Sequence, residues 1–412
     1  MPTEATEHDV VIYGATGFTG AQAARYFDAH VGATARWAIA GRSHAKLEAL
    51  RSTLHTKVAV VVADAHDEAA IDALVESTRV VLTTAGPYAR YGEPLLRACV
   101  TRGADYVDIT GETVWVRQMI DRYHDRAVRS GTRIVPFCGF DSVPSDLGAF
   151  LLVEHLRGLG RSTKSVKAFF RAQGGLNGGT LASLTEMMSS PERNRFDDPL
   201  LLCPEDARSA RDAIANRDPT LPSLDLDLGH WVAPFFMGPI NTRVVRRSAA
   251  LASGYQRGYG EPFRYQEYWN LGAPLSMFSS SVAAFAAGVF GALARVPGVG
   301  NVLQTLGPAP GQGPSEAAMD DGFFEGYFVA RADDDSRTWA CIADRGDPGN
   351  RATVKLVCES ALCLVHDRDR LPDRAGLLTP AIAFGHVLAD RLRNAGMRIV
   401  CPAEPPAGAR AD

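Results

Sequence analysis

The chain has 412 residues, of which 46% are hydrophobic and 22% charged, which is enough for about two to three domains with a sizeable core. This composition excludes a disordered chain, and a net charge of −4 offers no electrostatic basis for binding nucleic acid. Seven cysteines without a C-x-x-C pair exclude the common redox and zinc spacings, and a polar start without a signal-peptide pattern predicts a cytoplasmic protein.

Apolar runs typical of strands alternate with amphipathic runs typical of helices over residues 1–140. The expected strands are 9–13, 37–40, 58–63, 80–84, 106–109 and 133–137. The expected helices are 20–29, 45–54, 67–76, 94–102 and 114–130. Six β/α units in this order predict an α/β protein with a Rossmann, doubly wound parallel sheet.

Glycines punctuate the junction between the first strand and the first helix, in the order G-x-x-G-x-x-G. Gly14 allows a tight turn, Gly17 lets the backbone approach a pyrophosphate, and Gly20 permits close packing of helix on strand. The N-terminus of the helix adds an attraction for phosphate. At the first β/α junction, this spacing predicts dinucleotide binding rather than a plain tight turn.

The end of the second strand selects between the two nicotinamide dinucleotides. An NAD site needs an acidic residue there for the ribose 2′-hydroxyl, whereas this strand is followed by Arg42 and Ser43 with no acid. Arg42 can pair with a 2′-phosphate, so the sequence favours NADPH; the alternative is a solvated surface arginine. Asp64 ends the third strand, where it either faces the adenine or caps the next helix.

Small residues follow the fourth strand, in the run Thr84-Ala85-Gly86-Pro87, and let the chain pass under the nicotinamide ribose. Tyr88 and Tyr91 come next, and each is a candidate proton donor near the hydride-transfer face or a packing aromatic. Asp141 and Ser142 follow the sixth strand, at the carboxyl edge where ligands bind, and capping of the next helix is the alternative. The glycine-rich run 174–180 is either a source of amide donors for an oxyanion or a flexible turn.

The regular alternation of strands and helices ends after residue 140. Strands are expected at 165–172, 323–330, 338–343 and 352–357, the last two as an antiparallel hairpin around a turn-rich connection. Thr379-Pro380 is a good helix start, and the apolar stripe after it predicts a C-terminal helix that packs on the first domain. We therefore expect an NADP(H)-binding domain over 1–140, an inserted α+β domain with a mixed or antiparallel sheet over 141–372, and a returning segment over 373–412.

Residues 268–294 contain no charged side chain. The stretch is long enough to cross a bilayer, but it is rich in glycine, serine and alanine, so a buried helix or a substrate-facing segment is favoured over a membrane span. Peripheral contact with a membrane surface or an acyl chain is the remaining alternative.

The sequence lacks the motifs of several common enzyme classes. There is no G-x-S-x-G, no H-E-x-x-H and no Walker-type glycine-lysine pair, and no tyrosine has a lysine four residues later. The histidines are scattered singly, so no catalytic metal is expected.

Motifs spread over residues 9–397 resemble those of the saccharopine dehydrogenase-like oxidoreductases, and within these the trans-acting enoyl reductases. The motifs are GATGFTG, AGRSHAKLEAL, TTAGPYARYGEPLLRACVTRGADYVDITGE, GFDSVPSDLG, GGLNGGT, GDPGNRATVKLVCESALCLV and LLTPAIAFGHVL. The resemblance implies a Rossmann domain that binds NADP(H), with an inserted domain that supplies the substrate face and often a dimer interface. It also implies site residues, namely Gly14, Thr16, Gly17, Phe18, Thr19 and Gly20 for the phosphates, Arg42 for the 2′-phosphate, and Thr84, Ala85, Gly86 and Pro87 for the nicotinamide.

The same resemblance implies an acyl or polyketide substrate carried by a synthase, in lipid assembly. The favoured reaction delivers hydride from NADPH to C3 of an enoyl thioester, and a donor then protonates C2; Tyr88, Tyr91 and Ser142 are the candidate donors or oxyanion contacts. Reduction of an imine is the first alternative, and it would need a cluster of arginines for its carboxylates. A non-catalytic, lipid-associated NADP(H)-binding protein is the second.

Overall fold

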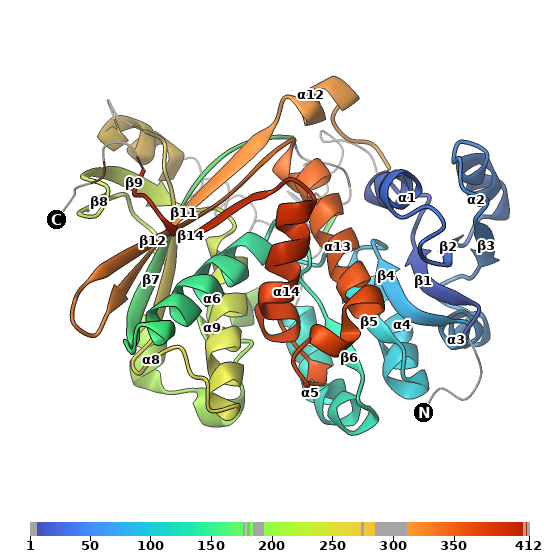
Figure 1. The fold of residues 1–412 in the computed structure, drawn as a ribbon, viewed down its shortest axis with the longest axis horizontal. Coiled ribbons are helices and arrows are strands. Elements are labelled where there is room, and N and C mark those ends of the chain that lie inside the picture. The colour runs from blue at the N-terminus through green and yellow to red at the C-terminus, as the bar shows by residue number, and fades with distance from the viewer. Residues whose placement is uncertain are drawn as a thin grey trace.

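The computed structural model describes residues 6–175, 178, 182–183, 193–272, 276–284, 311–406 and 409. Two seven-stranded sheets, named A and B here, lie at opposite ends of the molecule, and helices α6, α9, α13 and α14 fill the space between them (Figure 1). The chain therefore forms two sheet-based units joined by a shared helical layer.

Sheet A is the expected Rossmann sheet, with the order β13-β6-β5-β4-β1-β2-β3 and only parallel pairings. Its strands are β1 (His8–Tyr13), β2 (Trp37–Gly41), β3 (Ala59–Val62), β4 (Thr78–Thr83), β5 (Asp105–Asp108), β6 (Arg133–Val135) and β13 (Gly376–Leu377). The six strands expected before residue 140 are confirmed, with ends that differ by one or two residues. The seventh, β13, comes from the C-terminal part of the chain.

Both faces of sheet A are covered. Val10 and Ile12 of β1 pack into one core cluster, and Val11 and Tyr13 pack into the cluster on the opposite face, as the alternation along a strand requires. The helices of this part are α1 (Phe18–His30), α2 (His44–Arg51), α3 (Glu68–Glu76), α4 (Tyr88–Arg102) and α5 (Thr113–Ser130). Helix α4 begins six residues before the expected start at 94, because the Glu112 carboxylate caps its first turn.

Sheet B is mixed, with the order β14-β12-β11-β7-β10-β9-β8; β7 and β10 are parallel and the other pairs are antiparallel. Its strands are β7 (Thr163–Gln173), β8 (Ser223–Asp225), β9 (His230–Pro234), β10 (Arg264–Trp269), β11 (Phe323–Ala332), β12 (Arg337–Arg345) and β14 (Arg398–Ala403). Helices α6 (Val143–Gly158) and α9 (Gly238–Gly254) cover its inner face. The short helical elements are η1 (Arg193–Asp197), η2 (Glu205–Ala207), α8 (Ala210–Ala215), α12 (Glu316–Asp320), η3 (Pro348–Ala352) and η4 (Arg368–Arg370).

The strand expected at 352–357 is wrong, because this run is the start of helix α13 (Thr353–His366). Its apolar residues continue at helical spacing through Val357, Ala361 and Leu364, all of them buried. Helix α13 lies on sheet A, in contact with β1, β4, β5 and α1. The expected hairpin is therefore absent, and β12 pairs instead with β11 and β14.

The C-terminal part of the chain returns to the first domain in two steps. Helix α13 covers a face of sheet A, and β13 then pairs with β6 at its edge. Helix α14 (Pro380–Asn394) starts after Thr379 as expected and packs on α13, α6 and α9. We therefore propose that the return begins near residue 353, before the boundary drawn at 373. The last strand, β14, goes back to the edge of sheet B.

The uncharged stretch 268–294 is only partly described. Tyr268 and Trp269 end β10, and residues 276–284 are helical, with Met277, Phe278 and Val282 exposed. Residues 273–275 and 285–294 lie outside the described residues. Among the residues that are described, no helix is both long enough and apolar enough to cross a membrane.

Candidate functional site

The loop between β1 and α1 has the geometry of a phosphate cradle. Gly14 adopts φ 80°, which turns the chain sharply after the strand, and its N–H donates to the Ala40 carbonyl at 3.0 Å. A Cβ on Gly20 would overlap the Gly14 carbonyl oxygen, so only glycine lets α1 approach β1 this closely. Helix α1 has Gly17 at its N-cap and no side-chain cap. Its first turn can therefore bind a phosphate, which is the fit that NADP(H) requires.

The remaining residues of the loop border β2 and the inserted domain. Thr16 Oγ1 lies 3.9 Å from the position of a Cβ on Gly41, at the end of β2. A Cβ on Gly313 would overlap the Phe18 ring, so the segment before α12 packs against the loop. Thr19 lies in the first turn of α1 and is half-buried. The inserted domain therefore forms one wall of the candidate phosphate site.

The ends of β2 and β3 meet beside this cradle. The Ser43 side chain caps α2 by accepting the Lys46 N–H at 3.4 Å, which assigns it a structural role. Asp64 Oδ1 accepts the His66 N–H at 2.9 Å, and burial, followed by the charge of Asp64, raises the pKa of Tyr13 to about 12. The Arg42 side chain is exposed and forms no ion pair with any described carboxylate. We propose that it remains available for the 2′-phosphate.

Replacing Arg42 with Ala should weaken NADPH binding by about 10- to 100-fold, because a charge-assisted hydrogen bond contributes about 1.5–3 kcal/mol. NADH carries no 2′-phosphate, so its Kd should change less than about twofold. Titration of nicotinamide fluorescence with both dinucleotides measures the two values. Arg51→Ala is the matched control, since Arg51 lies on α2 and is paired with Glu48. Equal losses for NADPH and NADH would contradict the assignment.

The loop after β4 passes directly beside the cradle, as expected for the nicotinamide side. Thr84 Oγ1 donates to the Gly14 carbonyl at 3.4 Å, and the Ala85 backbone nitrogen lies 3.0 Å from the position of a Cβ on Gly14. Gly86, followed by Pro87, is exposed, and the Ser183 hydroxyl lies 3.3 Å from where its Cβ would be. A segment of the inserted domain therefore reaches the predicted nicotinamide end.

Glu112 joins these two segments and was not identified from the sequence. Its buried carboxylate accepts the N–H groups of Tyr88 and Ala89 and the Ser183 hydroxyl, each at 2.8 Å. The carboxylate is thus the cap of α4 and the anchor of Ser183 beside Gly86. The available signal was an acid three residues after the expected fifth strand, at the same carboxyl edge as the other site residues. Of the glycine-rich run 174–180, residues 176, 177, 179 and 180 lie outside the described residues.

The two tyrosines that are candidate proton donors lie in different surroundings. The Tyr88 hydroxyl is buried, donates to the Thr83 carbonyl at 3.1 Å and accepts the Ile109 N–H at 3.4 Å, and burial raises its pKa well above the usual value. Tyr91 is half-buried, and its ring meets the His66 ring edge-on at 5.8 Å. Since His66 follows β3, Tyr91 lies towards the adenosine side of the sheet. The buried and bonded hydroxyl of Tyr88 conflicts with the expected donor role, whereas the role of Tyr91 stays a prediction.

Ser142 is also inside the protein. It is fully buried, and its hydroxyl donates to Asn241 Oδ1 at 3.4 Å. Asn241 in turn donates to Glu267, which also accepts the Tyr265 hydroxyl, and burial raises the pKa of Glu267 to about 7. Ser142 therefore belongs to a polar network between α6, α9 and β10, and this position conflicts with direct contact with a substrate.

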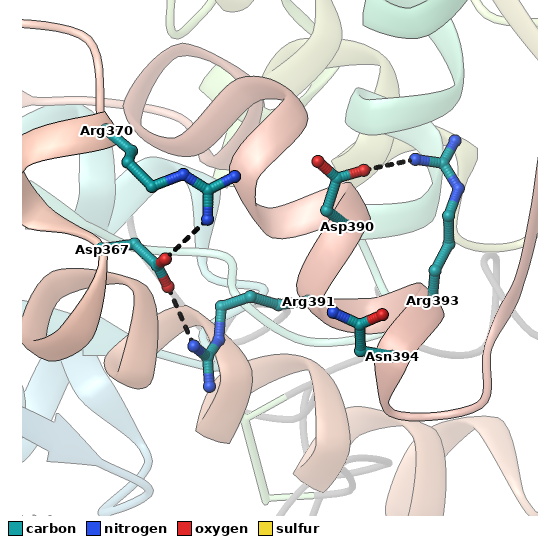
Figure 2. Close-up of a pocket in the computed structure, with 6 residues that line it drawn as sticks. All are labelled: Asp367, Arg370, Asp390, Arg391, Arg393 and Asn394. Atoms are coloured by element: carbon teal, nitrogen blue, oxygen red, sulfur yellow. Dashed lines mark hydrogen bonds and ion pairs between the residues drawn. The ribbon is translucent and has the colours of Figure 1, made fainter.

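A hollow of about 390 Å³ lies elsewhere, where α13 and α14 end (Figure 2). It is lined by Asp367, Arg370, Asp390, Arg391, Arg393 and Asn394. Asp367 accepts hydrogen bonds from Arg370 and Arg391, so these charges already have partners. The adjacent Arg368 pairs with Asp105, at the start of β5. The hollow is thus at the amino edge of sheet A, opposite the phosphate cradle, and is separate from the candidate site.

Comparisons with known proteins agree with this geometry. A family model described as the saccharopine dehydrogenase NADP binding domain matches residues 10–135. The chain is 39% identical to a putative trans-acting enoyl reductase of Mycobacterium tuberculosis, over 97% of this chain and 98% of that protein. A trans-acting enoyl reductase of Mycobacterium ulcerans is 37% identical, over 96% and 98% of the two chains. The fold is similar to that of yeast saccharopine dehydrogenase, with a TM-score of 0.54 and 14% identity over 96% of this chain and 100% of that one.

Proposed function

This chain belongs to the saccharopine dehydrogenase-like oxidoreductases, in the group of the trans-acting enoyl reductases, and from that premise we propose that it reduces the C2–C3 double bond of an enoyl thioester. It is an NADP-dependent oxidoreductase, and NADP(H) is its cofactor. The observation that carries the proposed reaction is the 39% identity with a protein named as a putative enoyl reductase, extended over 97% of the chain. The fold alone would leave the substrate open.

We propose that the acyl or polyketide chain reaches the enzyme on a carrier protein, in lipid biosynthesis. The word trans-acting in the names of the relatives supports a substrate that is held by another protein. The exposed side chains of Met277, Phe278 and Val282 are in keeping with an apolar substrate or a protein contact.

We propose that different residues of this chain bind the different parts of NADP(H). Gly14, Gly17 and the first turn of α1 hold the pyrophosphate, and Arg42 holds the 2′-phosphate. Thr84 and Glu112 fix the loop at the nicotinamide end through their bonds to Gly14 and to α4. When bound, NADPH supplies the two electrons and one hydrogen that the double bond gains.

Imine reduction has less support. One cluster of arginines among the described residues, Arg243, Arg246 and Arg247 of α9, is buried. They bind the carbonyl groups of Phe196, Pro199, Tyr265, Leu202 and Leu377, and two of them pair with Asp218. Because these contacts occupy the guanidinium groups, this cluster is not available for the carboxylates of an imine substrate.

A direct assay tests the proposed reaction. The purified protein is mixed with NADPH and crotonyl-pantetheine or longer 2-enoyl thioesters, and NADPH oxidation is followed together with mass analysis of the acyl product. We expect a product two mass units heavier, with NADH much less effective. Oxidation with mixtures of a 2-oxo acid and an amino acid, but not with enoyl thioesters, would favour imine reduction. Tight NADPH binding without turnover of either class would favour the non-catalytic alternative.

A further inference from the structure

Asp141 differs from the other acidic residues at the carboxyl edge of sheet A because its carboxylate has no hydrogen-bond or ion-pair partner among the described residues. Asp108 accepts the Thr110 and Phe137 N–H groups and the Tyr106 hydroxyl. Glu112 accepts from two N–H groups and Ser183, and Asp146 accepts from Ser248 and the Ala381 N–H. A carboxylate left half-buried without donors is costly, so its position calls for a function.

A continuous set of contacts links Asp141 to the nicotinamide end of the site. Its Oδ2 lies 3.8 Å from the position of a Cβ on Gly111, so the carboxylate lies next to the backbone of the loop after β5. The next residue, Glu112, holds Ser183, and the Ser183 hydroxyl lies beside Gly86. Asp141 thus lies on the loop between β6 and α6, at the same edge of sheet A as the loops after β4 and β5.

The charged side chains on the elements around Asp141 are bonded to other groups. On α9, the Ile240 side chain packs against Gly111, and the Arg243 guanidinium pairs with Asp218. On the loop after β5, the Glu112 carboxylate is bonded to α4, and on α6 the Asp146 carboxylate is bonded to Ser248. Burial, with no compensating cation, raises the pKa of Asp141 to about 6. A carboxyl group with such a pKa can donate a proton near neutral pH.

We propose that Asp141 is the proton donor of the reductase; this rests on the proposed enoyl reduction. After two electrons and a hydrogen from NADPH have been added at C3, the substrate is an enolate. The O–H bond of the Asp141 carboxyl breaks as a C–H bond forms at C2, and the negative charge moves from the enolate to the carboxylate. Solvent then returns the proton, since Asp141 is only half-buried. Tyr88 and Ser142 are buried and bonded to protein groups, so they do not compete for this role.

Replacing Asp141 with Asn keeps the shape of the side chain and removes the proton. We expect kcat with NADPH and crotonyl-pantetheine to fall about 100-fold or more, while the Kd for NADPH changes less than about twofold. The wild-type kcat should decline as pH rises above about 6, because the donor loses its proton. The kcat of the variant should not show this decline. Asp125→Asn is the matched control, because Asp125 is exposed on α5.

A second measurement does not depend on activity. The folded-state pKa of Asp141 is raised above its usual 3.8, so ionising it destabilises the fold as pH rises from about 4 through 6. The Asn variant should therefore have the same Tm as wild type near pH 4, and a Tm about 2 °C or more higher at pH 8.

The outcomes separate the two proposals. Wild-type protein that reduces no enoyl thioester would overturn the proposed function and, with it, the donor role of Asp141. Active wild-type protein, with an Asn variant within threefold of it and with the same pH profile, would overturn the donor role alone. A Tm difference that is independent of pH would also overturn it, because Asp141 would then not carry the proton near pH 6.

Discussion

Replacing Gly20 with Ala should abolish NADPH binding, with a Kd at least about 100-fold higher than that of wild type. The added Cβ would overlap the Gly14 carbonyl oxygen, and would lie 2.8 Å from Thr84 Oγ1 and 2.9 Å from the Ala15 Cα. Two of these three atoms belong to the backbone of the loop, so no side-chain rotation relieves the clash. The loop must move away from α1, and the first-turn N–H groups then lose their common direction towards a phosphate.

Fluorescence titration with NADPH and NADH measures this loss, which should be equal for the two dinucleotides. That equality distinguishes Gly20 from Arg42, whose replacement affects only NADPH. Gly158→Ala is the control, since Gly158 ends α6 and a Cβ there meets nothing within 4 Å. A Gly20→Ala protein that is folded by circular dichroism and binds NADPH like wild type would contradict the phosphate-cradle assignment.

Replacing Asp218 with Asn should lower the free energy of unfolding by about 3–5 kcal/mol, because it leaves two buried guanidinium groups without a countercharge. Asp218 pairs with Arg243 and Arg246, whose side chains are 1% and 3% exposed. It also accepts the Thr242 hydroxyl at 2.9 Å. Desolvation lowers the pKa of Arg246 to about 10, which shows how strongly this environment disfavours an unpaired cation.

Urea unfolding followed by tryptophan fluorescence measures the change, with Asp206→Asn as the control on the exposed turn η2. The NADPH affinity of the folded fraction should stay within about twofold of wild type, because α9 lies outside the phosphate cradle. A loss of stability below about 1 kcal/mol would mean that the arginines are held by backbone carbonyls alone.

The first domain and helix α14 follow from local sequence patterns, whereas α9 and α13, two of the helices between sheets A and B, do not. Strands β1 to β6 are predicted because each apolar run is bounded by turn residues and followed by an amphipathic helix. Helix α13 is missed because the apolar residues at its start fit the spacing of a strand as well as that of a helix. The helix is selected by its packing on sheet A, which the local sequence does not reveal. Helix α9 is missed because Arg243, Arg246 and Arg247 are buried, so its buried surface does not form an apolar stripe.

The candidate site is likewise predictable from the sequence only in part. The glycines of the cradle and Arg42 are recognised from their order along the chain, because the chemistry needs them at fixed distances from two strands. The role of Ser142 depends on a partner far away in the sequence, the Asn241 side chain, which lies 99 residues later. Glu112 is likewise defined by Ser183, 71 residues later. Such partners cannot be read from the neighbouring sequence.

The late return of the chain has a consequence for the order in which the protein is synthesised. One core cluster joins Val10 and Ile12 of β1 to Leu356 of α13 and Phe328 of sheet B. When the first 140 residues leave the ribosome, the face of sheet A that α13 covers is still bare, and the strand β13 that extends its edge is more than 200 residues away. The nascent nucleotide-binding domain thus keeps an exposed apolar surface until α13 and β13 have emerged, so its native folding depends on residues 353–377.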